Sequence, residues 1–445
     1  MEAILIKTAQ LLLSLSILVV LHEAGHFMFA RLFKTRVEKF YLFFNPWFSL
    51  FKVQKGETEY GVGWLPLGGY VKISGMIDES MDKEAMKLPP QPWEFRSKPA
   101  WQRLFIMLGG VLMNFIFAFL IYIAVLYAWG EQYLPTANVK YGIEVNETGK
   151  KLGFQTGDKI LSVDNKPVEE FQKVVPTIIL DAAKTVQVER NGQKVNVEIT
   201  GEDLALLLKS KEIWDLRWPY DMQIGKLAKD YPAEQAGLQV GDVLGDVDGN
   251  TFQYYDQFRD YLLSKKNSEV ELEINRNGEK MTKTLVVNDE GKLGFNPALN
   301  NPNVFEFKTI KYGFFESFPA GIGRGVQTTI NYLKQFKLFF KKDTKAYESL
   351  GGFATIGSIF APTWDWEHFW SMTAFISIIL AIMNLLPIPA LDGGHVMFLL
   401  GEIITGRKPG EKFLEYAQIV GMVLLLALVL YANANDIIKM INGTF

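Results

Sequence analysis

Two histidines that flank a glutamate are the residues of this chain best suited to metal-dependent chemistry. His22 and His26 stand four residues apart in the stretch HEAGH. On a helix of about 3.6 residues per turn, this spacing leaves the two imidazoles about 40° apart on one face, where both can reach one ion. Glu23 stands beside that face, where its carboxylate can accept a proton from metal-bound water. The pattern predicts a hydrolytic metal site with Glu23 as the general base.

The ligands of such a site must come from a small set of residue types. The chain has four histidines and no cysteine, which excludes thiolate ligands, thiol catalysis and disulfides. A catalytic zinc usually takes three protein ligands and keeps one position open. The best candidates for the third ligand are Asp392 and His395, in the stretch NLLPIPALDGGHVMF. Asp365 is a weaker candidate, because it lies at the opposite end of the preceding apolar segment.

Two prolines, Pro387 and Pro389, interrupt the chain just before Asp392. Prolines this close together cannot continue a regular helix, so we expect unwound backbone here. Unwound backbone at membrane depth is tolerated where it is buried in protein or lines a polar cavity. This stretch is therefore expected to meet the histidines.

Four apolar segments are long enough to cross a bilayer, which takes roughly 20 residues of helix. They are residues 4–32, 104–129, 369–386 and 413–431. The histidine pair lies in the first, where an ionisable side chain costs roughly 2.5 to 3.5 kcal/mol and is a functional candidate by default. No A-x-A cleavage site follows this segment, so we interpret it as a retained anchor and not as a signal peptide.

Basic residues predict the orientation, because short loops rich in Lys and Arg stay in the cytoplasm. The connections after the first and third segments carry such residues, namely Arg31, Lys34, Arg36, Lys39, Lys98, Arg103, Arg407, Lys408 and Lys412. We expect the region 131–367 and both termini to lie outside, with the metal site toward the cytoplasmic side. The net charge of −3 gives no argument for nucleic acid as a partner.

The external region contains a repeat. The stretch GFQTGDKILSVDNKPV from Gly153 returns as GLQVGDVLGDVDGNTF from Gly237, which indicates two copies of a module of about 85 residues. Each copy combines alternating strands with Asn-Gly or Asp-Gly turns. The modules resemble bacterial PDZ domains, which bind peptides by adding a strand to a sheet edge. The alternative is a pair of β-rich spacers without a peptide ligand.

A glycine-rich stretch, TEYGVGWLPLGGYVKISG over residues 58–75, is too short for a spanning helix. Its alternation of large residues and glycines predicts a β-hairpin or looped sheet. An ordinary cytoplasmic hairpin is the alternative. The stretch GIGRGV from Gly321 lacks the spacing of a dinucleotide-binding loop, and we expect a turn there, inside an amphipathic segment.

The two membrane motifs together resemble those of the site-2 protease family of intramembrane zinc metalloproteases. These motifs are HEAGH in the first span and N-x-x-P-x-P-x-L-D-G over residues 384–393. The resemblance implies that His22, His26 and Asp392 bind one zinc ion and that Glu23 is the general base. It implies that Asn384 holds substrate backbone near the metal. By the same resemblance, the glycine-rich stretch is a membrane-associated β-loop that presents an edge to the substrate. The residues expected to contact substrate are Asn384, Pro387, Pro389, Gly61, Gly63, Gly68 and Gly69.

The predicted fold is a polytopic α-helical membrane protein with four transmembrane helices, a membrane-associated β-loop and two extracytoplasmic β-rich PDZ domains. The expected regions are a membrane region 1–130 that includes the β-loop 50–76, PDZ domains 131–208 and 209–300, an amphipathic linker 301–367, and a membrane region 368–445.

The expected function is that of an intramembrane zinc metalloendopeptidase in the bacterial inner membrane, with the PDZ domains as a periplasmic substrate filter. By resemblance, the substrates are transmembrane segments of anti-sigma factor-like proteins already clipped outside the membrane, or remnant signal peptides. The alternative is a membrane PDZ scaffold without hydrolysis, whose metal site is structural or vestigial. Glu23 argues against that alternative, because a structural site has no use for a base there.

Overall fold

The computed structural model describes residues 2–66, 68–76, 89–210, 212–220, 222–298, 304–339 and 350–442. Leu67 of the predicted β-loop and parts of the predicted linker lie outside the described residues. The chain divides into two compact units. One comprises Met1–Gly130, Lys311–Leu333 and Leu350–Phe445, and the other comprises Glu131–Ile310 and Lys334–Ser349.

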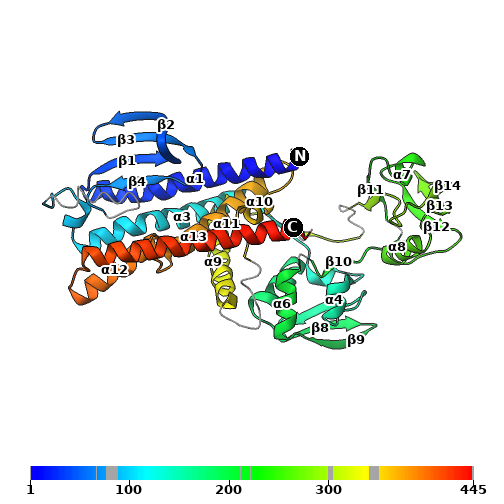
Figure 1. The fold of residues 1–445 in the computed structure, drawn as a ribbon. Coiled ribbons are helices and arrows are strands. Elements are labelled where there is room, and N and C mark those ends of the chain that lie inside the picture. Colours follow the sequence, from blue (N-terminus) through cyan, green and yellow to red (C-terminus); the bar gives the residue numbers. More distant parts are fainter. Residues whose placement is uncertain are drawn as a thin grey trace. The chain divides into compact units, whose positions relative to one another are not determined.

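Helices dominate the first unit, called here the membrane unit. They are α1 (Glu2–Leu32), α3 (Ala100–Ala128), α9 (Phe314–Phe339) as far as Leu333, α10 (Phe353–Ser358), α11 (Trp366–Leu385), α12 (Asp392–Thr405) and α13 (Glu411–Ile441), with a 3-10 turn at Phe95–Ser97. Four of them, α1, α3, α11 and α13, are long and apolar enough to cross a membrane. The four segments predicted to span the membrane therefore each form a helix of suitable length and composition. Figure 1 shows both chain termini at one end of this bundle and α12 at the other.

The α3 helix lies at the centre of the membrane unit, against α1, α11 and α12. Its contact with α1 is close, since a Cβ added to Gly25 would lie 2.2 Å from the carbonyl oxygen of Gly109. Small residues allow helix backbones to approach in membranes, where packing drives association. The α1 helix is thereby held against α3 at the level of the histidine pair.

A four-stranded sheet lies along α1 in the membrane unit (Figure 1). Its strands are β1 (Val37–Leu42), β2 (Phe44–Lys55), β3 (Thr58–Leu65) and β4 (Tyr70–Ile73), in the order β2-β3-β1-β4. The sheet begins before the predicted β-loop 50–76, because β1 and the start of β2 precede residue 50. Among the described strands, β4 is at one edge and pairs antiparallel with β1. The glycine-rich β3 is an inner strand, between β1 and β2.

The stretch GIGRGV lies inside α9, so the prediction of a turn at Gly321 was wrong. A Cβ added to Gly321 would lie 2.6 Å from the Cα of Ile123, and one added to Gly325 would lie 2.2 Å from the ring of Phe119. These glycines let α9 approach α3 closely, and that contact offsets their poor helix propensity.

The second unit, called here the external unit after the location predicted for it, contains two copies of the same series of elements. The first copy has β6 (Ile143–Val145), α4 (Glu147–Lys151), β7 (Lys159–Val163), α5 (Val174–Leu180), β8 (Thr185–Arg190), β9 (Gln193–Glu198) and β10 (Trp214–Leu216). The second has β11 (Ile224–Leu227), α7 (Pro232–Gln235), β12 (Val243–Val247), α8 (Tyr255–Ser264), β13 (Glu269–Arg276), β14 (Glu279–Val286) and β15 (Phe295–Pro297). In each copy the middle three strands form an antiparallel sheet, and the last strand pairs with the first. Within the described residues, the helix α6 (Gly201–Lys209) is an addition of the first copy.

A buried ion pair recurs in both copies and explains the repeated G-x-x-x-G-D motif. Arg190 donates to the two carboxylate oxygens of Asp158 at 2.8 and 2.7 Å, and Arg276 does the same to Asp242 at 2.7 and 2.8 Å. Burial alone would raise the pKa of Asp242, but the hydrogen bonds from Arg276 and from the backbone of Gln239 lower it below its ordinary value. The aspartate of the motif therefore joins the start of one strand to the end of another.

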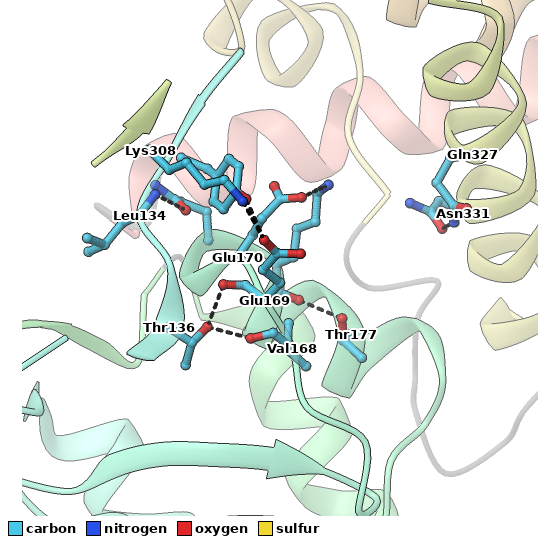
Figure 2. A network of polar contacts seen from close by, with 12 residues as sticks. Leu134, Thr136, Val168, Glu169, Glu170, Thr177, Lys308, Gln327 and Asn331 are labelled. Carbon is cyan, nitrogen blue, oxygen red and sulfur yellow. Dashed lines mark hydrogen bonds and ion pairs between the residues drawn. The ribbon is translucent and has the colours of Figure 1, made fainter. Parts of the chain in front are cut away.

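Two strands that pair with each other, β5 (Glu131–Tyr133) and β16 (Lys308–Ile310), lie at the two ends of the longer segment of the external unit, Glu131–Ile310. Figure 2 shows the polar contacts around them. The carboxylate of Glu169 accepts hydrogen bonds from the Tyr133 hydroxyl at 2.6 Å and from Lys308 Nζ at 3.2 Å. Thr136 Oγ1 donates to the carbonyl of Val168 at 2.6 Å. These contacts bind the strand pair to the first copy, next to the 3-10 turns Thr136–Asn138 and Phe171–Lys173.

Candidate metal centre

The two histidines of HEAGH project from the same face of α1, in the half of the helix that the sheet covers. Their Nε2 atoms lie 3.2 Å apart. His26 is buried, and its Nδ1 donates a hydrogen bond of 2.8 Å to the backbone carbonyl of Ile106 on α3. Because a carbonyl only accepts, Nδ1 of His26 carries a proton, and in the neutral imidazole Nε2 presents a lone pair.

Asp392 completes the cluster from a distant part of the chain. The α11 helix ends at Leu385, the next six residues are not helical, and Asp392 is the first residue of α12. Its Oδ2 lies 3.2 Å from Nε2 of His22 and 3.3 Å from Nε2 of His26. A carboxylate is stabilised at a helix N-terminus by the helix dipole. The break in the helix therefore both directs Asp392 toward the histidines and favours its ionised form.

The three converging atoms fit a zinc ion. A tetrahedral zinc site with bonds of about 2.0 to 2.1 Å has ligand atoms about 3.3 Å apart. The three separations here are 3.2, 3.2 and 3.3 Å. Moreover, Asp392 Oδ2 is a buried oxygen without a hydrogen-bond partner among the described residues. A cation accounts for an oxygen and two ring nitrogens that face one another so closely.

Glu23 shares a cavity of about 500 Å³ with this cluster. The strand β4 forms another wall of the cavity. Gly69, just before β4, lies against α1, since a Cβ there would be 2.8 Å from Val19 Cγ1 and 3.7 Å from Glu23 Cγ. The Glu23 side chain therefore lies near the cluster of His22, His26 and Asp392 but is not part of it. This is the position expected of a residue that accepts a proton beside a metal.

The structure brings only some of the predicted substrate-contacting residues to this cavity. Asn384 is near, with its Nδ2 3.5 Å from His22 Nε2, and Gly69 lines the cavity. Gly61 and Gly63 lie in β3, where an added Cβ would be 2.3 Å from the Tyr41 ring and 2.1 Å from the Phe44 carbonyl oxygen. The prediction that they contact substrate has no support in this geometry, because their small size serves strand packing.

The remaining predicted residues lie around the break between α11 and α12. Pro387 and Pro389 belong to the non-helical stretch, as the sequence predicts. The carbonyl of Pro389 packs against α13, where a Cβ added to Gly421 would meet it. Gly68 lies beside the ring of Phe44 and has a φ of +143°, which a glycine adopts at low cost.

The alternative ligands stand apart from the cluster. Among the described residues, the group that could hold a metal ion comprises His22, His26 and Asp392. His395 lines the same cavity outside that group. Asp365 caps α11 at its other end, where its Oδ1 accepts from the backbone N–H of His368 at 3.0 Å.

Two residues of α3 at the metal centre were not found from the sequence. A Cβ added to Gly110 would lie 2.5 Å from both His22 Cε1 and His26 Nε2. Asn114, one turn further, places its Nδ2 3.4 Å from His22 Nδ1. An asparagine within an apolar span is a functional candidate by default. That signal was present in the sequence for Asn114, whereas Gly110 shows its role only in the packing.

Replacing Gly110 with alanine is expected to weaken zinc binding by about tenfold or more, because overpacking at a well-packed site costs about 1 to 3 kcal/mol. The zinc dissociation constant of the purified protein measures this. Gly401→Ala on α12 is the matched control, since nothing lies within 4 Å of a Cβ added there. Equal zinc affinity in both variants would contradict the close packing of α3 on the histidines.

The chain combines apolar helices long enough to cross a membrane with two histidines and an aspartate that converge beside a glutamate. This combination is typical of membrane metalloproteases. The chain belongs to one family of that class, peptidase family M50, whose model matches residues 10–428.

Curated relatives that align with this chain along nearly their whole length support the assignment to this family. The chain is 29% identical to the regulator of sigma E protease of Haemophilus influenzae, over 96% of this chain and 98% of that protein. It is 28% identical to the regulator of sigma-E protease RseP of Salmonella typhimurium, over 98% of this chain and 99% of that protein. A relative from Neisseria meningitidis, 27% identical over 96% of this chain and 97% of its own length, is named as a zinc metalloprotease. The chain is therefore a metalloprotease.

Proposed function

We propose that this metalloprotease is an intramembrane endopeptidase that holds one zinc ion and cleaves transmembrane segments of other membrane proteins. The observation that carries the proposal is the convergence of His22, His26 and Asp392 in a cavity between membrane helices, which Glu23 shares. A protease for soluble substrates would have little reason to place its site on apolar helices, where polar groups are costly.

The residues around the cavity divide the reaction between them. His22, His26 and Asp392 hold the zinc, which when bound acts as a Lewis acid and makes water a better nucleophile. Glu23 takes a proton from the attacking water on a carboxylate oxygen and passes it to the leaving amine. The Asn384 amide, next to His22, binds substrate backbone beside the scissile bond.

The edge strand β4 offers a way to hold an unwound substrate. A transmembrane helix hides its peptide bonds in internal hydrogen bonds, and unpaired amides in lipid cost several kcal/mol each. Tyr70–Ile73 line the cavity and form an edge of the sheet among the described strands. Pairing of the substrate with β4 would replace the lost hydrogen bonds by strand addition.

The relatives' names indicate a regulatory role. Two of them carry the name regulator of sigma E protease, and we infer by likeness that this chain acts in regulated intramembrane proteolysis in a bacterial inner membrane. Its substrates would be anti-sigma factor-like proteins already clipped outside the membrane, or remnant signal peptides. The two copies of the external unit would be periplasmic PDZ-type modules that filter substrates. A scaffold without hydrolysis gains no support, because Glu23 lies at the metal centre and the family is one of peptidases.

The substrate class can be tested with the purified protein in lipid vesicles. We expect zinc-dependent cleavage of a model transmembrane peptide, loss of that cleavage with a chelator, and its return when zinc is added. A water-soluble peptide of the same sequence around the cleaved bond, flanked by charged residues, is the control. Preferential cleavage of the soluble peptide would contradict the assignment to transmembrane substrates.

The filter role predicts a gain of activity on deletion. Replacing residues 139–287 with a flexible linker is expected to leave zinc bound and short substrates cleaved, since the described residues of the metal cluster all belong to the membrane unit. Substrates with an intact external domain, which the full-length protein rejects, should then be cleaved as well. If the deleted protein binds zinc but rejects the uncut substrates and loses the short ones, the modules recruit substrates and do not exclude them.

A further inference from the structure

Asn114 is a fully buried polar side chain in the middle of the apolar helix α3. Its Nδ2 lies 3.4 Å from Nδ1 of His22. Its Oδ1 is buried and, among the described residues, has no hydrogen-bond partner. A buried acceptor left unpaired costs about 1 to 3 kcal/mol. The position of this oxygen therefore needs a physical explanation.

The neighbouring His26 shows what a ligand histidine requires here. Its Nδ1–H donates to the carbonyl of Ile106, which leaves the Nε2 lone pair directed at the cluster. A neutral imidazole has one donor nitrogen and one acceptor nitrogen. If His22 is to present an Nε2 lone pair as well, its Nδ1 must carry the proton and needs an acceptor. Asn114 is the side chain found at that nitrogen.

A rotation of the Asn114 amide by 180° exchanges its oxygen and its nitrogen. The oxygen then accepts from His22 Nδ1–H, and the amide nitrogen takes the position that the oxygen leaves. Before this rotation, with Asn114 Nδ2 next to His22, Nδ2–H would donate to Nδ1. The ring proton of His22 would then be on Nε2, which faces Asp392 Oδ2 at 3.2 Å. That tautomer has no lone pair on Nε2, the nitrogen that faces Asp392. The orientation of one amide thus distinguishes a His22 that can bind zinc from one that cannot.

The backbone of Asn114 is fixed independently of its side chain. Its carbonyl accepts a hydrogen bond of 2.8 Å from Ser377 Oγ on α11, which any substitution at residue 114 leaves in place. The side chain can therefore be changed while α3 remains joined to α11 at this point.

We propose that Asn114 is a positioning residue of the metal centre: its Oδ1 accepts from His22 Nδ1–H and holds the His22 Nε2 lone pair toward the metal. This inference rests on the proposed zinc site. It assigns to α3 a part in metal binding through a second contact, since α3 already supplies the carbonyl of Ile106 to His26. Such partners of ligand histidines typically change metal affinity 10- to 100-fold when removed.

Two substitutions of similar size test the role. Asn114→Leu removes the acceptor, and Asn114→Asp keeps an acceptor in the same place. We expect Asn114→Leu to weaken zinc binding by about 10- to 100-fold, and Asn114→Asp to stay within a few-fold of the unchanged protein. The measurements are the zinc dissociation constant by chelator competition and the visible absorption of the Co²⁺-substituted full-length protein, both without substrate. The Co²⁺ spectrum should shift in the leucine variant and be retained in the aspartate variant.

A purely structural role would give the opposite order, because leucine suits an apolar helix and a buried carboxylate does not. Zinc affinity unchanged in Asn114→Leu, or lost more strongly in Asn114→Asp, would overturn the proposal. If the leucine variant does not fold, Asn114→Ala replaces it with the same expected loss. If the unchanged protein binds zinc, the variants rank as expected and no transmembrane peptide is cleaved, then the proposed function fails while the role of Asn114 stands. A protein that binds no zinc overturns both.

Discussion

Substitution of Glu23 by glutamine is expected to abolish peptide-bond cleavage and to leave zinc bound. The amide has nearly the shape of the carboxylate but cannot accept the proton of the attacking water. General base catalysis contributes about 10²- to 10⁴-fold, so the rate should fall by at least about 10²-fold. Zinc should stay, because Glu23 lies outside the group formed by His22, His26 and Asp392. Cleavage of a transmembrane peptide and zinc content, measured on the same preparation, test both statements.

Glu57→Gln is the matched control, because it makes the same chemical change at an exposed turn between β2 and β3. It should behave as the unchanged protein does. Activity that survives Glu23→Gln would mean that another group accepts the proton. Loss of zinc from that variant would make Glu23 a ligand, and the division of roles in the cavity would have to be redrawn.

Substitution of Asp392 by asparagine is expected to weaken zinc binding more than any change at His395. Its Oδ2 is the atom that faces both ring nitrogens, at 3.2 and 3.3 Å, and the amide removes its negative charge. Changes to partners of ligands cost about 10- to 100-fold in affinity, so loss of a ligand charge should cost at least about 100-fold. His395→Ala should change the affinity by much less, since His395 lies outside the group of converging atoms.

The ranking of the two variants decides the third ligand. Zinc dissociation constants for Asp392→Asn and His395→Ala, measured side by side by chelator competition, give it directly. A greater loss in His395→Ala would make that histidine the ligand and would leave Asp392 as its neighbour. Retention of the helical circular dichroism signal in both variants confirms that each comparison is between folded proteins.

The sequence by itself determined those features that depend on neighbouring residues along the chain. The spacing of His22 and His26 puts them on one helix face wherever that helix lies, because the helical repeat is a property of the backbone. The four spans follow from local hydropathy. The repeat of G-x-x-x-G-D follows from self-similarity, and the structure gives each copy the same elements and the same buried Arg–Asp pair.

Tertiary structure alone decided which distant residues meet these local features. The residues left Asp392 and His395 as alternatives, and only the direction of the break between α11 and α12 brings one carboxylate oxygen to both histidines. The place of the glycines was likewise a matter of packing, since Gly69 lines the cavity while Gly61 and Gly63 fit against neighbouring strands.

The part played by α3 shows the physical reason most clearly. Gly110 and Asn114 lie more than eighty positions from the histidines along the chain, yet they touch them because α1 and α3 approach closely at Gly25 and Gly109. Local periodicity predicts which face of a helix is polar, but the partner of that face depends on the fit of whole helices to one another. Close packing of small residues decides that fit in a membrane, where hydropathy does not distinguish one helix neighbour from another.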